Sequence, residues 1–169
     1  WRPEYKQSSG IANRVQSGNS LAFFSTYATH NAGAYTTVQI PGSGTRQVKF
    51  SISAQSWTAS KGDDDQGILD TNYYGAVVID PHGGVDPNSA SVQWSGLTEL
   101  PNVEPDESAS WVNLEKTLST DSDKVTVFIR GNNKYPFRNN DSYWDNAQLI
   151  VDGTAVGKAS SESVLASNE

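Results

Sequence analysis

Apolar and polar residues alternate along much of this chain, in short runs that turn-forming residues separate. In the longest run, Arg46–Trp57, every second residue from Val48 to Ala54 is apolar and the residues between them are polar. Because successive side chains of a β-strand point to opposite sides of a sheet, this alternation predicts a half-buried strand. Runs with the helical period are scarce, so the pattern favours an all-β fold.

The same alternation predicts several other strands. We expect them at Ala34–Ile40, Tyr74–Ile79, Ser91–Ser95, Trp111–Leu118, Val125–Arg130 and Trp144–Val151, with a short one at Leu21–Phe24. Turn-formers lie between them, for example in Pro41–Gly44 and Pro81–Gly84. About eight strands with this punctuation predict a two-sheet antiparallel β-sandwich of the jelly-roll form. A closed barrel is the main alternative.

A chain of 169 residues fits one domain. We predict a β-sandwich domain over residues 1–151. Residues 152–169 contain no aromatic residue, which favours a linker or C-terminal tail. The alternative for this tail is a strand or helix that docks on a partner. The segment Leu100–Ser110 holds two prolines and three acidic residues, and we expect it to be a solvated connector.

Charge and composition disfavour several classes of function. The formal net charge is −7 and there is no run of Lys or Arg, which argues against binding to nucleic acid. No apolar stretch approaches the roughly 20 residues of a spanning helix, so we expect no membrane insertion. The chain has no Cys, which excludes thiolate chemistry, and no Met, which indicates a processed piece of a longer product. We therefore expect a secreted or cell-surface protein.

The polar face of the Arg46–Trp57 run suggests a ligand. The C–H patch of a sugar ring stacks on an aromatic face, and planar amide or guanidinium groups bond its hydroxyls. A sheet face that carries Gln55 beside Trp57 offers both kinds of contact. We predict these two as carbohydrate-binding residues. The alternative is that Trp57 covers an edge of the core.

The segment Gly131–Asp145 is the second candidate, because it concentrates aromatic and amide side chains between the last two predicted strands. We predict that Tyr135 and Arg138 line a pocket there, with Asn140 bonding sugar hydroxyls. The alternative is a self-packed loop in which Asn and Asp side chains cap turns. His30 lies in a turn-like stretch, and we expect a hydrogen-bonding structural role for it.

Acidic clusters are typical of Ca²⁺ sites, because Ca²⁺ takes about six to eight oxygen ligands. Asp80 and Asp86 flank a Gly-Gly turn, which is consistent either with a cation site or with ordinary turn chemistry. A second cluster does not fit the EF-hand spacing and has a solvated acidic loop as its alternative; it comprises Asp63, Asp64, Asp65 and Asp70.

An ordered set of motifs resembles a known family. Tyr143–Leu149, with the sequence YWDNAQL, resembles the last strand of galactose-binding-like jelly-roll modules, whose pattern is (Y/F)-W-D-(D/N)-(V/A)-x-L. These include carbohydrate-binding modules of bacterial secreted or cell-surface proteins. Ser17–Leu21, followed by Tyr35–Val38, resembles the opening of such modules. Gly75–Trp94 resembles a variety from large secreted bacterial surface proteins, and the resemblance covers about residues 15–151.

This resemblance implies a jelly roll that binds glycans either on its concave sheet face or in the loops at one end. It also implies a metal role for Asp145. The matching Asp in the family often helps to bind a structural Ca²⁺, together with backbone oxygens near the first strand, here about Ser17–Asn19. A structural Ca²⁺ is therefore the one cofactor that we expect.

We predict a non-catalytic carbohydrate-binding module. Its expected partners are oligosaccharides or polysaccharides, together with neighbouring domains of a larger surface protein. The alternative function is a structural or adhesive β-sandwich module of a cell-surface protein or filament. An enzyme is disfavoured, because the chain has no Gly-x-Ser-x-Gly elbow, His-Glu-x-x-His pair, P-loop or Rossmann fingerprint.

Overall fold

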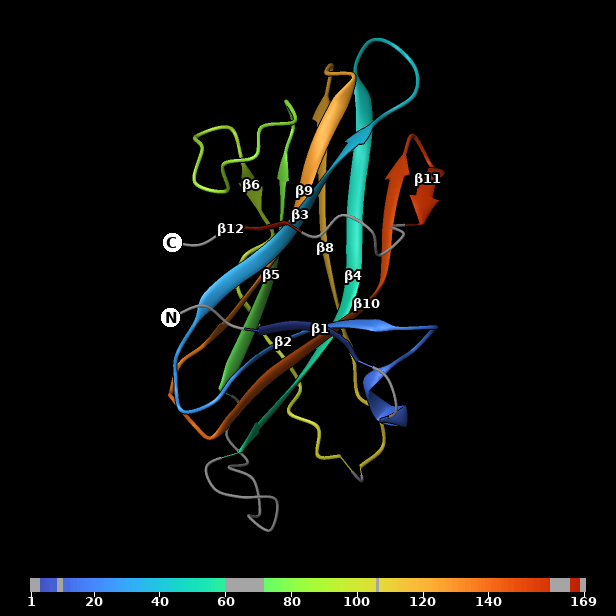
Figure 1. Cartoon of the computed structure of the whole chain (residues 1–169). Coiled ribbons are helices and arrows are strands. Elements are labelled where there is room, and N and C mark those ends of the chain that lie inside the picture. The colour runs from blue at the N-terminus through green and yellow to red at the C-terminus, as the bar shows by residue number, and fades with distance from the viewer. Residues whose placement is uncertain (1–3, 9–10, 60–71, 106, 159–164, 168–169) are drawn as a thin grey trace.

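The computed structural model describes residues 4–8, 11–59, 72–105, 107–158 and 165–167 of the chain. Nearly every element is a β-strand (Figure 1). The strands are β1 Glu4–Ser8, β2 Ser20–Ser25, β3 Asn31–Gln39, β4 Arg46–Ala59, β5 Tyr73–Asp80, β6 Gln93–Trp94, β7 Thr98–Glu99, β8 Val112–Thr120, β9 Lys124–Asn133, β10 Asn139–Val151, β11 Thr154–Lys158 and β12 Leu165–Ser167. A short 3-10 helix, η1, covers Ala12–Arg14. Among the described residues, no helix has the length and apolar character needed to cross a bilayer.

Two antiparallel sheets form a sandwich whose long strands β4, β9 and β10 run along its length (Figure 1). The first sheet has the order β1-β2-β10-β4-β8, with β11 paired to β10. The second sheet has the order β12-β3-β9-β5-β6, with β7 paired to β5. From β2 to β5, and again from β8 to β10, successive strands alternate between the sheets, which is the jelly-roll arrangement. The predicted two-sheet fold is confirmed, and the closed-barrel alternative is not what forms.

The core between the sheets is built around Trp144 of β10, whose side chain is only 1% exposed. Its indole reaches the second sheet where Gly75 and Gly131 pair across β5 and β9. A Cβ atom on Gly75 would lie 2.9 Å from Trp144 and 2.9 Å from Leu100. Because interiors are close-packed, a glycine is needed here to admit the indole. Phe23 of β2 packs on the same ring system, with ring centroids 5.8 Å apart.

The loop predicted at Gly131–Asp145 is shorter in the structure. β9 continues to Asn133 and β10 begins at Asn139, so five residues, 134–138, connect the two strands. In the opposite sense, the strand predicted at Ser91–Ser95 is reduced to Gln93–Trp94. The sandwich is therefore more extended than predicted at the β9–β10 end and more irregular before β6.

The sheet continues past the predicted domain boundary at residue 151. β10 turns back at Asp152 and Gly153 and pairs with β11. Both turn residues have positive φ angles, 47° and 81°, which is the conformation of a two-residue type I′ hairpin. Farther along the chain, β12 pairs with β3. Residues 152–158 thus belong to the sandwich and are not a linker.

The first half of the segment Leu100–Ser110 is anchored, contrary to the expectation of a solvated connector, whereas residues 107–110 are exposed as predicted. The side chains of Leu100 and Val103 are buried. Ser56 of β4 donates its backbone N–H to Pro101 O at 2.8 Å, and Val103 N donates to Ser56 O at 2.9 Å. The connector therefore follows the edge of β4 like an additional short strand and helps to cover it.

Candidate functional site

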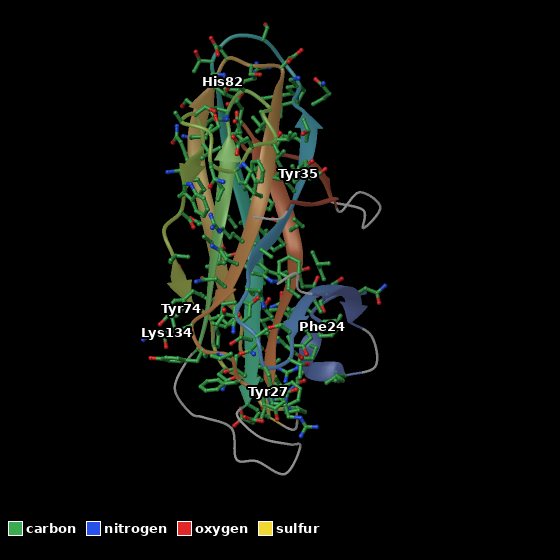
Figure 2. All side chains as sticks on the ribbon, turned by 60° about the vertical axis from the view of Figure 1, so that its left-hand side comes forward. Phe24, Tyr27, Tyr35, Tyr74, His82 and Lys134 are labelled. Carbon is green, nitrogen blue, oxygen red and sulfur yellow. The ribbon has the colours of Figure 1, made fainter. Side chains whose placement is uncertain are left out.

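Exposed aromatic side chains gather at one end of the sandwich. Two loops meet there, the β2–β3 loop (residues 26–30) and the β9–β10 loop (residues 134–138). Tyr27 is 64% exposed and Tyr135 is 47% exposed. Figure 2 shows Tyr27 and Lys134 at this end of the molecule. We call these two loops the aromatic end.

Tyr27 is held in a costly backbone conformation. Its φ angle is 51°, in the left-handed region that bulky residues rarely adopt. Its N–H donates a 2.8 Å hydrogen bond to Phe137 O, so the neighbouring loop holds this backbone in place. Because the ring of Tyr27 faces water, its burial does not offset the cost of this strained backbone. Such strained residues concentrate at functional sites.

Tyr135 lies in the other loop with a second ring beside it. The ring centroids of Tyr135 and Phe137 are 5.8 Å apart, and the ammonium of Lys134 lies 5.0 Å from the Tyr135 centroid. Arg138 is half-buried and forms no hydrogen bond or ion pair with the residues that the structure describes. The loop therefore presents one exposed ring face together with two cationic hydrogen-bond donors.

A buried asparagine fixes the position of Tyr135. Asn72, immediately before β5, is 1% exposed. Its Oδ1 accepts a hydrogen bond from Tyr135 N at 2.6 Å, and its Nδ2 donates to Tyr135 O at 3.0 Å. The same Nδ2 donates to Asn140 Oδ1 at 3.0 Å. Buried polar networks of this kind make a local structure rigid when their members are satisfied.

Two further buried asparagines connect the loops. Asn133 Nδ2 donates to Ala28 O at 3.1 Å. Asn140 Nδ2 donates to Phe137 O at 2.6 Å and makes a longer contact, 3.4 Å, with Ala28 O. We call Asn72, Asn133 and Asn140 the asparagine frame. It holds both loops of the aromatic end against the strands beneath them, so the exposed rings stand on a preformed support.

His30 completes this support. Its N–H donates to Asn133 Oδ1 at 2.8 Å, and its ring nitrogens contact Ser25 Oγ at 2.9 Å and the Tyr73 hydroxyl. The side chain is 5% exposed. Burial lowers the pKa of His30 to about 4, so the ring is neutral at neutral pH. This is the structural role that the sequence predicts.

The structure divides the predicted carbohydrate-binding residues. Tyr135 and Arg138 lie in the aromatic end. Asn140 lies beneath it with no exposed surface, and its amide is used by the two loops. The prediction that Asn140 contacts sugar hydroxyls is therefore corrected: this residue positions the loops. It behaves as the self-packed alternative describes, whereas Tyr135 of the same segment stays open to solvent.

Gln55 and Trp57 lie on the outer face of the first sheet, as the alternation predicts, but other segments cover them. Gln55 is 0% exposed and its Nε2 donates to Asn13 O at 2.5 Å. The guanidinium carbon of Arg14 in η1 lies 5.7 Å from the Trp57 ring centroid. Trp57 Nε1 donates to Glu104 Oε2 at 3.1 Å. Because η1 and the connector fold over this face, these two residues do not form the open sugar-binding face that the sequence suggested.

Asp145 is surrounded by N–H donors. Its Oδ2 accepts hydrogen bonds from Gln16 N at 2.7 Å and Ser17 N at 3.0 Å, and its Oδ1 accepts from Asn146 N at 2.6 Å. A Ca²⁺ ion needs oxygen ligands, and within the described part of the chain no group of three or more His, Cys, Asp or Glu could hold a metal. The described contacts of Asp145 are thus all made by N–H donors, and the structural Ca²⁺ expected there stays a prediction. This carboxylate ties the segment before β2 to β10.

The remaining acidic candidates either form hydrogen bonds within turns or lie outside the described residues. Asp80 accepts hydrogen bonds from His82 N at 2.7 Å and Ser91 Oγ at 2.8 Å. Burial alone would raise the pKa of Asp80, but these bonds and one from Gly84 N hold it below its usual value. Asp86 accepts from a backbone N–H two residues ahead, an Asx turn. Outside the described residues lie Asp63, Asp64, Asp65 and Asp70.

A solved structure shares this fold. The structure of the carbohydrate-binding module TmCBM61 in complex with β-1,4-galactotriose matches the chain with a TM-score of 0.54 and 10% sequence identity. The match covers 88% of this chain and 87% of that one. The chain has the fold of that carbohydrate-binding module. No protein-family model and no curated protein matches the sequence. At this identity the likeness shows the fold, and the ligand has to be argued from the site.

Proposed function

We propose that this chain is a non-catalytic carbohydrate-binding module that takes neutral oligosaccharides at its aromatic end. The observation that carries the proposal is the pair Tyr27 and Tyr135. Both rings face solvent on loops that buried amides hold in place. The likeness of the fold to a carbohydrate-binding module supports it.

The physical basis is stacking combined with hydrogen bonding. A phenol ring offers an electron-rich face to the C–H groups of a pyranose, at low conformational cost because it has two side-chain torsions. Lys134 and Arg138 lie in the same loop and donate hydrogen bonds to ring hydroxyls. The asparagine frame reduces the entropy lost on binding, since the loops are already ordered. Affinity should still be modest, because each sugar hydroxyl gives up water to bind.

The aromatic end lacks the groups that sugar cleavage requires. Most glycosidases use two carboxyl groups at a fixed separation. Neither loop, residues 26–30 or residues 134–138, contains Asp or Glu. Binding without turnover is therefore the activity that these loops support. A module that binds polysaccharide is most useful outside the cell, so we also propose that the protein is secreted or displayed at the cell surface.

Isothermal titration calorimetry and affinity gels test the proposal. The first ligand is β-1,4-galactotriose, followed by a panel of neutral oligosaccharides. Tyr135→Ala and Tyr27→Ala should each weaken binding about threefold to tenfold, the loss expected for one good stacking contact. Tyr35→Ala is the matched control, because Figure 2 shows Tyr35 away from the aromatic end. Its binding should equal that of the unchanged protein.

Two results would overturn the proposal. Binding that survives both tyrosine variants but is lost in Tyr35→Ala would place the site on the sheet. If the protein binds none of the neutral glycans, the structural or adhesive role is the better explanation. In that case the exposed rings would form a contact surface for a neighbouring module, and the chain should associate in a concentration-dependent manner.

A further inference from the structure

A groove crosses the outer face of the second sheet, apart from the loops of the aromatic end. It spans β3, β9, β5 and β6. The side chains that matter here alternate with the core positions of these strands, and the register brings Phe128 of β9 next to Val78 of β5, which in turn pairs with Trp94 of β6. The lining of the groove includes Asn31, Gly33, Val78, Trp94, Phe128 and Arg130, together with Pro87 and Asn88 of the connection between β5 and β6.

Arg130 is held in one orientation from two sides. Its guanidinium carbon lies 4.9 Å from the centroid of the Trp94 ring. Its Nε donates a 2.5 Å hydrogen bond to Oδ1 of Asn31. Both terminal NH₂ groups are without a hydrogen-bond partner in the described part of the chain. The stacked and bonded guanidinium therefore presents a preoriented pair of donors to the groove.

Arg130 has no counter-charge among the residues that the structure describes. The chain carries a net charge of −7, with 19 acidic against 12 basic residues. Yet no carboxylate in the described regions lies within ion-pair distance of Arg130. The ion pair found in those regions joins Lys49 to Glu115. A fixed guanidinium without a counter-charge, on a protein that is otherwise acidic, is suited to an anionic ligand.

The walls of the groove suit a ring that carries this anion. The rings of Phe128 and Tyr35 lie side by side with centroids 5.5 Å apart. Between them and Arg130, a Cβ on Gly33 would lie 2.0 Å from the backbone oxygen of Ile129, so no side chain is tolerated there. Phe128 itself is only 4% exposed, so the ring surface that a ligand can reach here comes from the half-buried side chains of Tyr35 and Trp94.

We propose that this groove binds a uronic acid residue of an acidic oligosaccharide. The carboxylate of the sugar accepts two hydrogen bonds from the terminal nitrogens of Arg130, in the bidentate geometry that guanidinium and carboxylate share. The pyranose ring lies against the half-buried rings of Tyr35 and Trp94, and Asn31 is within reach of its hydroxyls. This site is separate from the aromatic end and does not depend on the neutral-sugar proposal.

Trigalacturonate and its methyl ester provide the decisive comparison, because they share one skeleton and differ in charge. Titration of the whole chain, followed by calorimetry and by chemical-shift changes of the Arg130 and Trp94 side-chain N–H signals, should show binding of the acid. The ester should bind at least about tenfold more weakly than the acid. Raising the salt concentration should weaken the binding of the acid but not that of the ester. Equal binding of acid and ester would overturn the proposal.

Substitutions then assign the contact. Arg130→Gln should weaken the binding of trigalacturonate at least about tenfold. Arg130→Lys keeps the charge but loses the two parallel N–H donors of the guanidinium, so it should recover only part of the affinity. Asn31→Ala, a change at an exposed residue that leaves folding intact, should weaken binding severalfold by releasing Nε of Arg130. Full affinity in both Arg130→Gln and Asn31→Ala would refute the assignment.

Two controls separate this site from its neighbours. Tyr135→Ala should leave trigalacturonate binding unchanged, and Arg130→Gln should leave neutral-glycan binding unchanged, so the failure of one proposal can be told from the failure of the other. Acetate alone should bind far more weakly than trigalacturonate. Acetate that competes as strongly as the trisaccharide would show a plain anion site and would overturn the uronate assignment.

Discussion

Removing the amide of Asn72 should destabilise the fold and also loosen the ligand site. The Asn72→Ala variant loses the 2.6 Å bond from Tyr135 N, the 3.0 Å bond to Tyr135 O and the 3.0 Å bond to Asn140 Oδ1. Tyr135 O keeps a partner, because Asn133 Nδ2 also donates to it at 2.8 Å. Tyr135 N–H and Asn140 Oδ1 are left without the partner that Asn72 supplied.

The magnitude follows from these contacts. A net hydrogen bond contributes about 0.5–1.5 kcal/mol, and a buried group left unpaired costs about 1–3 kcal/mol. Two groups lose their partner and a third is weakened, so we expect the free energy of unfolding to fall by about 2–4 kcal/mol. For a domain of this size, 1 kcal/mol corresponds to about 2–4 °C, and the melting temperature should fall by roughly 5–15 °C.

Urea denaturation and thermal melting measure this loss. Asn113→Ala is the matched control, because Asn113 is exposed and its amide makes one 3.3 Å bond to the exposed side chain of Glu115. Its effect should stay within about 0.5 kcal/mol. Below its melting temperature, Asn72→Ala should also bind neutral glycan more weakly, since the Tyr135 loop is no longer held. A loss of stability under about 1 kcal/mol would refute the asparagine frame as the support of the aromatic end.

Four further outcomes are expected. Tyr27→Asn should raise the free energy of unfolding by about 1 kcal/mol, because Asn tolerates positive φ, while weakening glycan binding in calorimetry; a less stable variant would contradict the strain argument. As pH falls from about 6.5 towards 4, His30 takes up a proton in the unfolded state but not in the folded state, because its folded pKa is about 4. The free energy of unfolding, measured by urea titration, should therefore decline by up to about 3 kcal/mol over this range. The His30→Gln variant should lack this part of the pH dependence. Gly75→Ala, whose Cβ would lie 2.9 Å from Trp144, should cost about 1–3 kcal/mol by overpacking, and Gly75→Ala with Trp144→Phe should regain part of it. Because the described partners of Asp145 are N–H donors, EDTA should leave the melting temperature unchanged. A fall that added Ca²⁺ reverses would instead establish the calcium site that the sequence predicts.

The fold was within reach of the sequence because alternation is a local property. The apolar positions of the Arg46–Trp57 run are buried in β4 as the period of two requires. Strand ends and the last hairpin were harder to predict. The signal for that hairpin was present, since Asp152-Gly153 between apolar runs is a strong two-residue turn, but the lack of aromatic residues after it favoured a linker instead.

The site was only partly within reach, because its geometry depends on contacts between distant residues. An Asn-rich loop predicts either ligand contacts or turn capping, and the sequence does not separate them. Asn72 and Asn133 were not singled out, since no local pattern shows that their amides meet under a loop. Tyr27 was missed for a similar reason: its strained backbone is imposed by Phe137, more than 100 residues later in the chain.

The two outer faces of the sandwich differ in how far other parts of the chain cover them. On the first sheet, Gln55 and Tyr143 are buried under η1, and Arg14 lies 4.8 Å from the Tyr143 ring centroid. Burying a guanidinium is costly, and desolvation lowers the pKa of Arg14, so this cover is a committed part of the fold. On the second sheet, Arg130 is held over Trp94, and its terminal donors have no partner in the described part of the chain. The same residue type thus closes one face and leaves the other able to receive a ligand.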